Sequence, residues 1–321
     1  MHVPAERVLV IVTLSGGNDG LNTVIPYSDP VYQSQRPSLA WGASQVVPLA
    51  DGLGLTPTMG GLGQAWTDGR LAVVRGVSYP NPDYSHFSSM AKWQSGDPSG
   101  QSLSGWVGRL LDKVANSRLA VSIGSTLPLL MTGEKVRGVT VPTGGLSLPL
   151  SRPGTSAYTY MATAGPRQGV LADIAATDLE LTAVGTDLSK ILAAVPRTKT
   201  TGGSLGTQLD LVSRLIQGGA PTRIYHASIG GFDTHVNEKS SHASVVGQMS
   251  QAITSFLTSL GPHQPRVALM TYSEFGRRVA VNASSGTDHG SSAPVLVVGG
   301  TGGPVVGGFY GDEPALSNLD N

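Results

Sequence analysis

Short apolar runs recur along the chain, and stretches with helical spacing lie between several of them. The run from Arg7 to Leu14 (RVLVIVTL) is continuous and rich in β-branched residues, which predicts a buried strand that opens into a tight loop at Ser15–Gly20. Five further strands are predicted from similar runs at 71–77, 119–123, 223–229, 267–272 and 295–298. Apolar residues three and four positions apart predict amphipathic helices at 175–195, 205–216 and 241–260.

Alternation of strands and helices favours an α/β fold with a mainly parallel, doubly wound sheet flanked by helices. We expect one domain over residues 1–321. The segments 142–169 and 198–206 are rich in Gly, Ser, Thr or Pro, so we predict loops or insertions there and no domain boundary.

Composition narrows the classes of partner and of site. Lys plus Arg and Asp plus Glu both total 21, so a small molecule or another protein is a better partner than nucleic acid or an anionic membrane. The chain has no cysteine, which excludes disulfides, thiolate zinc sites and cysteine nucleophiles. No apolar run approaches the roughly 18 residues of a membrane span. The start Met1-His2-Val3-Pro4 lacks a signal-peptide pattern, so we expect that any export signal has been removed.

Unusual polar residues follow or precede the predicted strands. In an open α/β sheet, ligands bind beyond the carboxyl ends of the strands. Carboxylate oxygen together with imidazole nitrogen suits zinc, manganese or a similar cation. Alternatively, the Asp side chains cap helices and the His side chains bond backbone carbonyls. The candidate metal ligands are Asp19, His86, Asp233, His235, Asp288 and His289.

Three further residues are candidates for catalysis. Ser85 precedes a predicted helix that begins near Phe87, where a hydroxyl and free amides would meet an anion; a simple N-cap is the alternative. Glu274 and Arg277 follow the strand at 267–272 and are expected to bind an anion or support a metal ligand. A surface ion pair at a helix start is their alternative explanation.

Five segments together resemble a known family: SGGNDGLNTVIPY, PNPDYSHF, GGFDTH, TYSEFGRR and GTDHGSSAP. Over nearly the whole chain the sequence resembles a bacterial family of exported (twin-arginine type) proteins, defined only as a domain of unknown function, within the alkaline phosphatase and sulfatase superfamily. The resemblance implies an alkaline phosphatase-like sheet and a two-metal site. Members continue with a further strand and helix, so it also implies a truncated or short chain.

The resemblance assigns roles to individual residues. Asp19, Asp288 and His289 would form one metal centre, Asp233 and His235 would contribute to the other, and Ser85 would be the hydroxyl nucleophile. No His follows His289 at the position of the usual third ligand of the second metal. His86 and His242 are the candidates for it, and solvent exposure or helix capping explains His242 more simply.

The implied function is hydrolysis of phosphate or sulfate monoesters, small or glycan-linked, in the periplasm or outside the cell. The expected cofactor is a divalent metal, with zinc or manganese ahead of calcium or magnesium. One alternative is a non-catalytic exported binding or envelope-assembly protein that keeps the fold, with or without one metal. Another is phosphoryl transfer within one molecule, as in the metal-dependent phosphoglycerate mutases.

Overall fold

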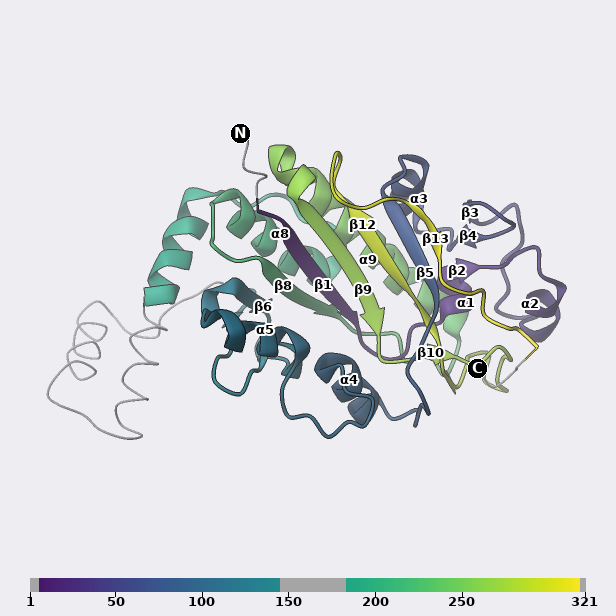
Figure 1. Cartoon of the computed structure of the whole chain (residues 1–321). Helices are drawn as coiled ribbons and strands as arrows, with labels where there is room; N and C mark the ends of the chain where they lie inside the picture. The colour runs from purple at the N-terminus through teal and green to yellow at the C-terminus, as the bar shows by residue number, and fades with distance from the viewer. Residues whose placement is uncertain (1–5, 145–182, 318–321) are drawn as a thin grey trace, which may run out of the picture.

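The computed structural model describes residues 6–144 and 183–317 and is built around one large twisted sheet (Figure 1). Eight strands lie in the order β13-β5-β12-β9-β1-β8-β6-β7. All of them run in one direction except β12, which is antiparallel to both of its neighbours, β5 and β9. The predicted mainly parallel sheet is therefore confirmed.

The bounds of the strands match the apolar runs closely because most residues of each run are buried or partly buried in the sheet. The central strands and their neighbours are β1 (Val8–Leu14), β5 (Leu71–Val77), β6 (Ala120–Ile123), β7 (Val139–Val141), β8 (Ile224–Ile229), β9 (Val267–Ser273), β12 (Ala293–Gly299) and β13 (Gly308–Tyr310). All six predicted strands are present. The short edge strands β7 and β13 were not predicted.

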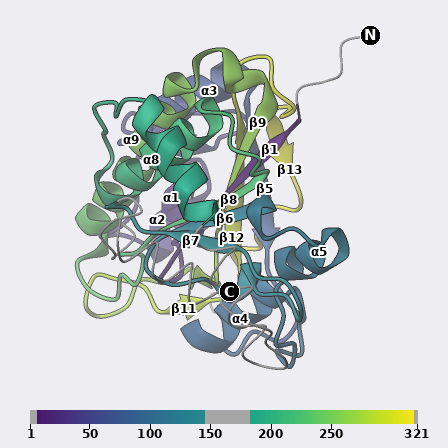
Figure 2. The ribbon, with the colours of Figure 1, turned by 90° about the vertical axis from the view of Figure 1, so that its left-hand side faces the viewer.

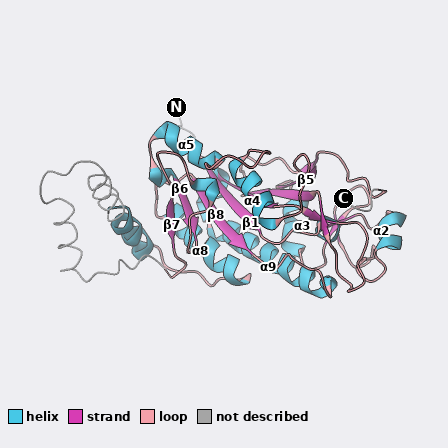
Figure 3. Cartoon of the chain, turned by 90° about the horizontal axis from the view of Figure 1, so that it is seen from below, coloured by secondary structure: helices cyan, strands magenta, loops and turns pink. Residues whose placement is uncertain are grey.

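Helices cover both faces of the sheet, as the doubly wound prediction requires (Figures 2 and 3). Alternate side chains of β1, such as Val10 and Val12, pack in a core with α8 (Gly203–Gln217), α9 (Glu238–Ser259) and α3 (Gly60–Thr67). Ile11, between them, points to the opposite face. There it shares a smaller core with α5 (Trp106–Val114), next to α4 (His86–Ser95).

Two predicted helices are confirmed within a few residues, as α8 and α9. A helix covers residues 183–194 of the third predicted segment, whose first part lies outside the described residues. Most of the predicted loop at 142–169 also lies outside them. The loop predicted at 198–206 ends at Gly202, because α8 begins at Gly203 and includes the last four residues of that prediction.

Small elements complete the described part of the chain. They are α1 (Gly20–Thr23), α2 (Pro30–Gln35), the 3-10 helices at Ser117–Leu119, Leu129–Met131 and Gly261–Arg266, the three-stranded sheet of β2 (Val24–Ile25), β4 (Gly54–Leu55) and β3 (Val47–Pro48), and the pair of β10 (Gly276–Arg277) with β11 (His289–Gly290). No helix among the described residues is long and apolar enough to cross a membrane.

Candidate metal centre

The loops that carry the predicted ligands meet at one edge of the sheet. Strands β1, β8 and β9 are parallel neighbours, so the segments that follow them leave from the same edge. The segment after β5, which leads into α4, leaves there too, because β12 reverses between β5 and β9. The same reversal explains why Asp288 and His289, which precede a strand, reach this edge.

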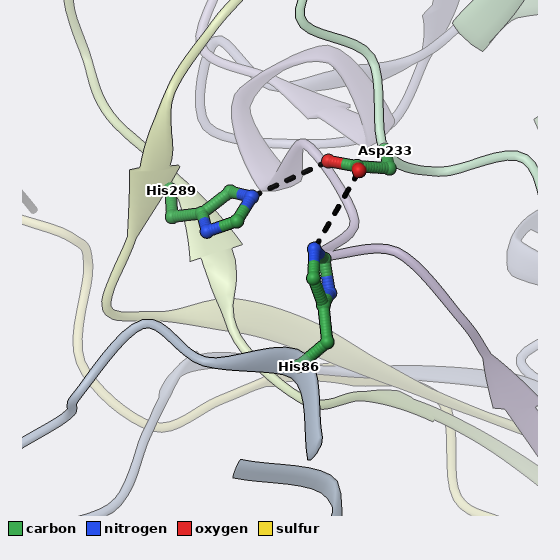
Figure 4. Close-up of side chains that lie close together, drawn as sticks. All are labelled: His86, Asp233 and His289. Carbon is green, nitrogen blue, oxygen red and sulfur yellow. Dashed lines mark hydrogen bonds and ion pairs between the residues drawn. The ribbon is translucent and has the colours of Figure 1, made fainter. Parts of the chain in front are cut away.

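Three histidines surround the carboxylate of Asp233. Its Oδ1 lies 3.0 Å from Nε2 of His235 and 3.3 Å from Nε2 of His289, and its Oδ2 lies 3.6 Å from Nε2 of His86. The two Nε2 atoms of His235 and His289 are 3.1 Å apart. Figure 4 shows His86 and His289 reaching Asp233 from different elements. Donor atoms of His86, Asp233 and His289 therefore lie within 4.8 Å of one another, and Nε2 of His235 lies beside those of Asp233 and His289.

An oxygen atom holds the far nitrogen of each imidazole. Nδ1 of His86 is 2.8 Å from Glu274 Oε1, and Nδ1 of His289 is 2.8 Å from the carbonyl oxygen of Tyr84. Nδ1 of His235 is 3.3 Å from Asp288 Oδ1. A carbonyl or carboxylate oxygen can only accept, so each Nδ1 donates. In the neutral rings, Nε2 then carries a lone pair that faces Asp233.

This donor set fits a divalent cation. The lone pairs of Nε2 and of the carboxylate oxygens point at one another, and they repel unless a cation or a proton lies between them. A metal-bound His commonly donates its other N–H to a carbonyl or carboxylate oxygen, as each Nδ1 does here. Donor atoms around a tetrahedral zinc ion, about 2.0–2.1 Å from it, are roughly 3.3 Å apart. The contacts among Asp233, His235 and His289 measure 3.0, 3.1 and 3.3 Å.

Arg277 holds Asp233 in place from the protein interior. Its side chain is fully buried in β10, and Nη2 donates to Asp233 Oδ1 and to the carbonyl oxygens of Gly16 and Phe232. Nε and Nη1 donate to the carbonyl oxygens of Gly17 and Thr287. Burial raises the pKa of Asp233, but the hydrogen bond and charge of Arg277 outweigh it, so the pKa lies below its usual value.

The charge states of Asp288 and His289 favour metal binding near neutral pH. The hydrogen bond from Asn282 is the main cause of a lowered pKa at Asp288, which therefore stays ionised and accepts from His235. Burial lowers the pKa of His289, so this ring stays neutral to lower pH than a free imidazole. Protons therefore compete less with a cation at His289.

Asp19 lies in a separate buried group. Its carboxylate has no exposed surface, and Oδ2 forms an ion pair of 2.5 Å with Nη1 of Arg36. The carboxyl of Glu238 is also buried, and burial together with the charge of Asp19 raises the pKa of Glu238. The role of Asp19 as a metal ligand stays a prediction. In the structure its carboxylate has other partners.

Ser85 is exposed at the start of α4 and directly precedes His86. Its side chain makes no capping hydrogen bond to α4, so the N-cap explanation describes its position in the helix but not a use of its hydroxyl. The carboxylate of Asp83 instead accepts from the Ser85 amide, from the hydroxyls of Ser88 and Ser89, and from Lys92 Nζ. The nucleophilic role of Ser85 stays a prediction.

The structure groups the predicted residues differently from the resemblance. Asp233 and His289 were expected in different centres, but they lie together with His86 and His235. Asp288 is placed at the outer nitrogen of His235, and Glu274 at that of His86. Whether Asp288 also binds a metal directly stays a prediction.

Two alternative explanations are corrected. Arg277 is not in a surface ion pair at a helix start, because it is fully buried in a strand. His242 is neither exposed nor a cap: it is buried within α9, 3.1 Å from Asn18 Oδ1, and burial lowers its pKa to about 4.

Sequence reasoning missed Tyr84, Arg36 and Glu238. Tyr84 acts through a backbone carbonyl, which any residue type has, and its positive φ of 56° is not visible in its letter. Arg36 lies just after a short helix, in a segment without periodic apolar residues. Glu238 looks like an ordinary first-turn acid of α9.

Comparison with known proteins gives a family match over part of the chain. A family model described as "Protein of unknown function (DUF1501)" matches residues 164–319. This segment includes Asp233, His235, Asp288 and His289, and the predicted resemblance to a family of unknown function is confirmed there. No curated protein has significant sequence similarity to the chain.

Several solved structures are similar over most of the chain but at low identity. The C-terminal periplasmic domain of EcEptC from Escherichia coli, in complex with Zn, is 9% identical over 94% of this chain and 75% of that chain, with a TM-score of 0.45. Alkaline phosphatase from the Antarctic bacterium TAB5 is 10% identical over 95% of both chains, with a TM-score of 0.42. Ps i-CgsB in complex with k-i-k-neocarrahexaose is 9% identical over 97% of this chain and 70% of that chain, with a TM-score of 0.46. At these TM-scores, no functional role is transferred from those proteins.

Proposed function

We propose that this protein is a divalent-metal-dependent hydrolase of phosphate or sulfate monoesters. One observation carries the proposal: three imidazole Nε2 atoms converge on the carboxylate of Asp233, while an oxygen holds each Nδ1. His86, Asp233, His235 and His289 would hold the cation. Nitrogen and oxygen donors together favour zinc or manganese over calcium and magnesium.

A bound divalent cation would supply Lewis-acid polarisation of the ester and a lowered pKa for an oxygen nucleophile. The protein's own groups would position the anion. Ser85 is exposed beside His86 at the N-terminus of the ten-residue helix α4, where backbone amides and the helix dipole favour negative charge. Its hydroxyl is the candidate nucleophile. Arg277 is buried and would act by orienting Asp233.

Turnover of an aryl phosphate and an aryl sulfate, with zinc, manganese, magnesium or calcium added, tests this function. We expect metal-dependent release of the aryl alcohol from one of the two esters, and loss of activity in His289→Gln. His263→Gln, a substitution in the 3-10 helix after α9, is the matched control and should remain active. A folded, metal-loaded protein that hydrolyses neither ester would contradict the proposal and favour the binding alternative.

Ser85→Ala tests the nucleophile separately. If Ser85 forms a covalent intermediate, this variant should lose at least a hundredfold in kcat while its metal content is unchanged. Full activity in Ser85→Ala would remove Ser85 from the proposal, and water would then be the nucleophile.

We also propose that the protein acts outside the cytoplasm. The support is the resemblance of the sequence motifs to an exported family. Expression of the full-length gene followed by cell fractionation tests the location. Recovery only in the cytoplasm would contradict it and would revive the mutase-type alternative.

A further inference from the structure

Asp19 and Arg36 form an ion pair without any exposed surface on either side chain. Arg36 uses all three of its nitrogens within the protein. Nη1 binds Asp19 Oδ2, Nε donates to the carbonyl of Val279 at 2.8 Å, and Nη2 donates to the carbonyl of Arg278 at 2.6 Å. The guanidinium therefore links the loop after β1 to the segment after β10.

The second carboxyl of the buried group belongs to Glu238. Asp19 Oδ1 and Glu238 Oε1 are both buried and have no hydrogen-bond partner among the described residues. Burial and the charge of Asp19 raise the pKa of Glu238 to about 9, so Glu238 is neutral near pH 7. Thr287 Oγ1 donates to Glu238 Oε2 at 2.6 Å, so the group also reaches the loop that carries Asp288 and His289.

The group of Asp19, Arg36 and Glu238 carries no net charge and connects several segments of the chain. With Glu238 neutral, Asp19 carries the single negative charge of the two acids, and Arg36 balances it. The three side chains join the loop after β1, the start of α9 and both ends of the segment that connects β10 to β11. A cation bound by several loops would make such connections. A second cation at Asp19 would have to displace a buried guanidinium and lie beside its positive charge.

We propose that the centre of His86, Asp233, His235 and His289 binds one divalent cation, and that the guanidinium of Arg36 takes the place of a second cation at Asp19. The inference rests on the metal site proposed above but not on its catalytic activity. It disagrees with the two-metal site that the family resemblance implies, and Asp19 is the point of disagreement.

Metal stoichiometry tests the proposal directly. The purified protein is saturated with Zn²⁺, freed of excess metal by gel filtration and analysed for zinc per folded chain; a Mn²⁺-loaded sample is examined by electron paramagnetic resonance. We expect one ion per chain and no exchange coupling between Mn²⁺ ions. Two ions per chain would overturn this inference and leave the proposed hydrolase intact. No bound ion would overturn the metal site itself.

Two isosteric variants locate the ion. Asp233→Asn should lose it, whereas Asp19→Asn should still bind one ion per chain, with a lower melting temperature because the pair with Arg36 is lost. Loss of an ion from folded Asp19→Asn would contradict the proposal. If Asp19→Asn does not fold, the wild-type stoichiometry and the Mn²⁺ spectrum still decide between one ion and two.

Discussion

At the scale of single residues, each histidine of the centre depends on an oxygen that does not itself face Asp233. The three oxygens differ in their surroundings. Glu274 is 2% exposed, whereas the side chain of Asp288 is 51% exposed, and the third oxygen is the backbone carbonyl of Tyr84. A charge in a buried position is screened less by water. Glu274 should therefore affect its histidine more strongly than Asp288 does.

Glu274→Gln should weaken metal binding about 10- to 100-fold, the usual effect of losing a partner of a ligating His. The amide keeps the size of the side chain, but it removes the negative charge that holds Nδ1–H of His86. Competition with a chelator of known affinity measures the change. Glu313→Gln, at an acid 63% exposed beside Arg75, is the control and should bind metal like the wild type. Equal affinity for Glu274→Gln and the wild type would contradict this role.

The residue types that form the centre were predictable, but their partners were not. Asp and His in glycine-flanked loops after apolar runs indicated a metal site, and Asp233, His235 and His289 do lie together. Which of them share one centre depends on side-chain directions that spacing does not encode. Asp19 also follows a strand, but only the fold shows that Arg36 lies against it.

At the scale of elements, the strands were predictable because burial on both faces produces continuous apolar runs, as in β1 and β9. The direction of β12 was not predictable. Its sequence would suit a parallel strand equally well, and only its pairing with β5 and β9 reverses it. Helix α3, which contains three glycines, has weak helix propensity and was also missed.

Close contact between two loops should make Gly286 intolerant of a side chain. A Cβ at this position would lie 2.2 Å from the carbonyl carbon of His235 and 2.6 Å from the amide nitrogen of Val236. Gly286→Ala should therefore push the loop of Asp288 and His289 away from His235. We expect a loss of about 1–3 kcal/mol in the free energy of unfolding and weaker metal binding.

Gly60→Ala is the matched control, because a Cβ there would meet no atom within 4 Å. Gly60 opens helix α3, so alanine should be neutral or slightly stabilising. Urea unfolding and chelator competition measure the two variants in parallel. Equal stability and equal metal affinity in both variants would show that the two loops can separate without consequence.

At the scale of the whole molecule, the sheet interior contains a histidine on β8, the strand that leads into the loop of Asp233 and His235. His226 lies on β8 between two neighbouring strands, with Nε2 3.0 Å from Thr13 Oγ1 on β1 and Nδ1 3.0 Å from Ser122 Oγ on β6. Hydroxyls can either donate or accept, so the neutral ring is fully bonded in this position. Burial lowers the pKa of His226 from 6.5 to about 4.

Folding should therefore become less favourable as the pH falls from 6.5 to about 4. Below pH 6.5 the unfolded chain binds a proton at residue 226, and the folded chain excludes it until about pH 4. The unfolded state then holds more protons, so the free energy of unfolding decreases by about 1.4 kcal/mol for each unit by which the pH falls.

Urea unfolding between pH 6.5 and about pH 4, with chelator present to remove the metal contribution, measures this slope. His226→Gln should reduce the slope by about that amount, even if its stability is lower at every pH, whereas His263→Gln should leave the slope as in the wild type. An unchanged slope in His226→Gln would mean that residue 226 takes up its proton equally in the folded and unfolded chains.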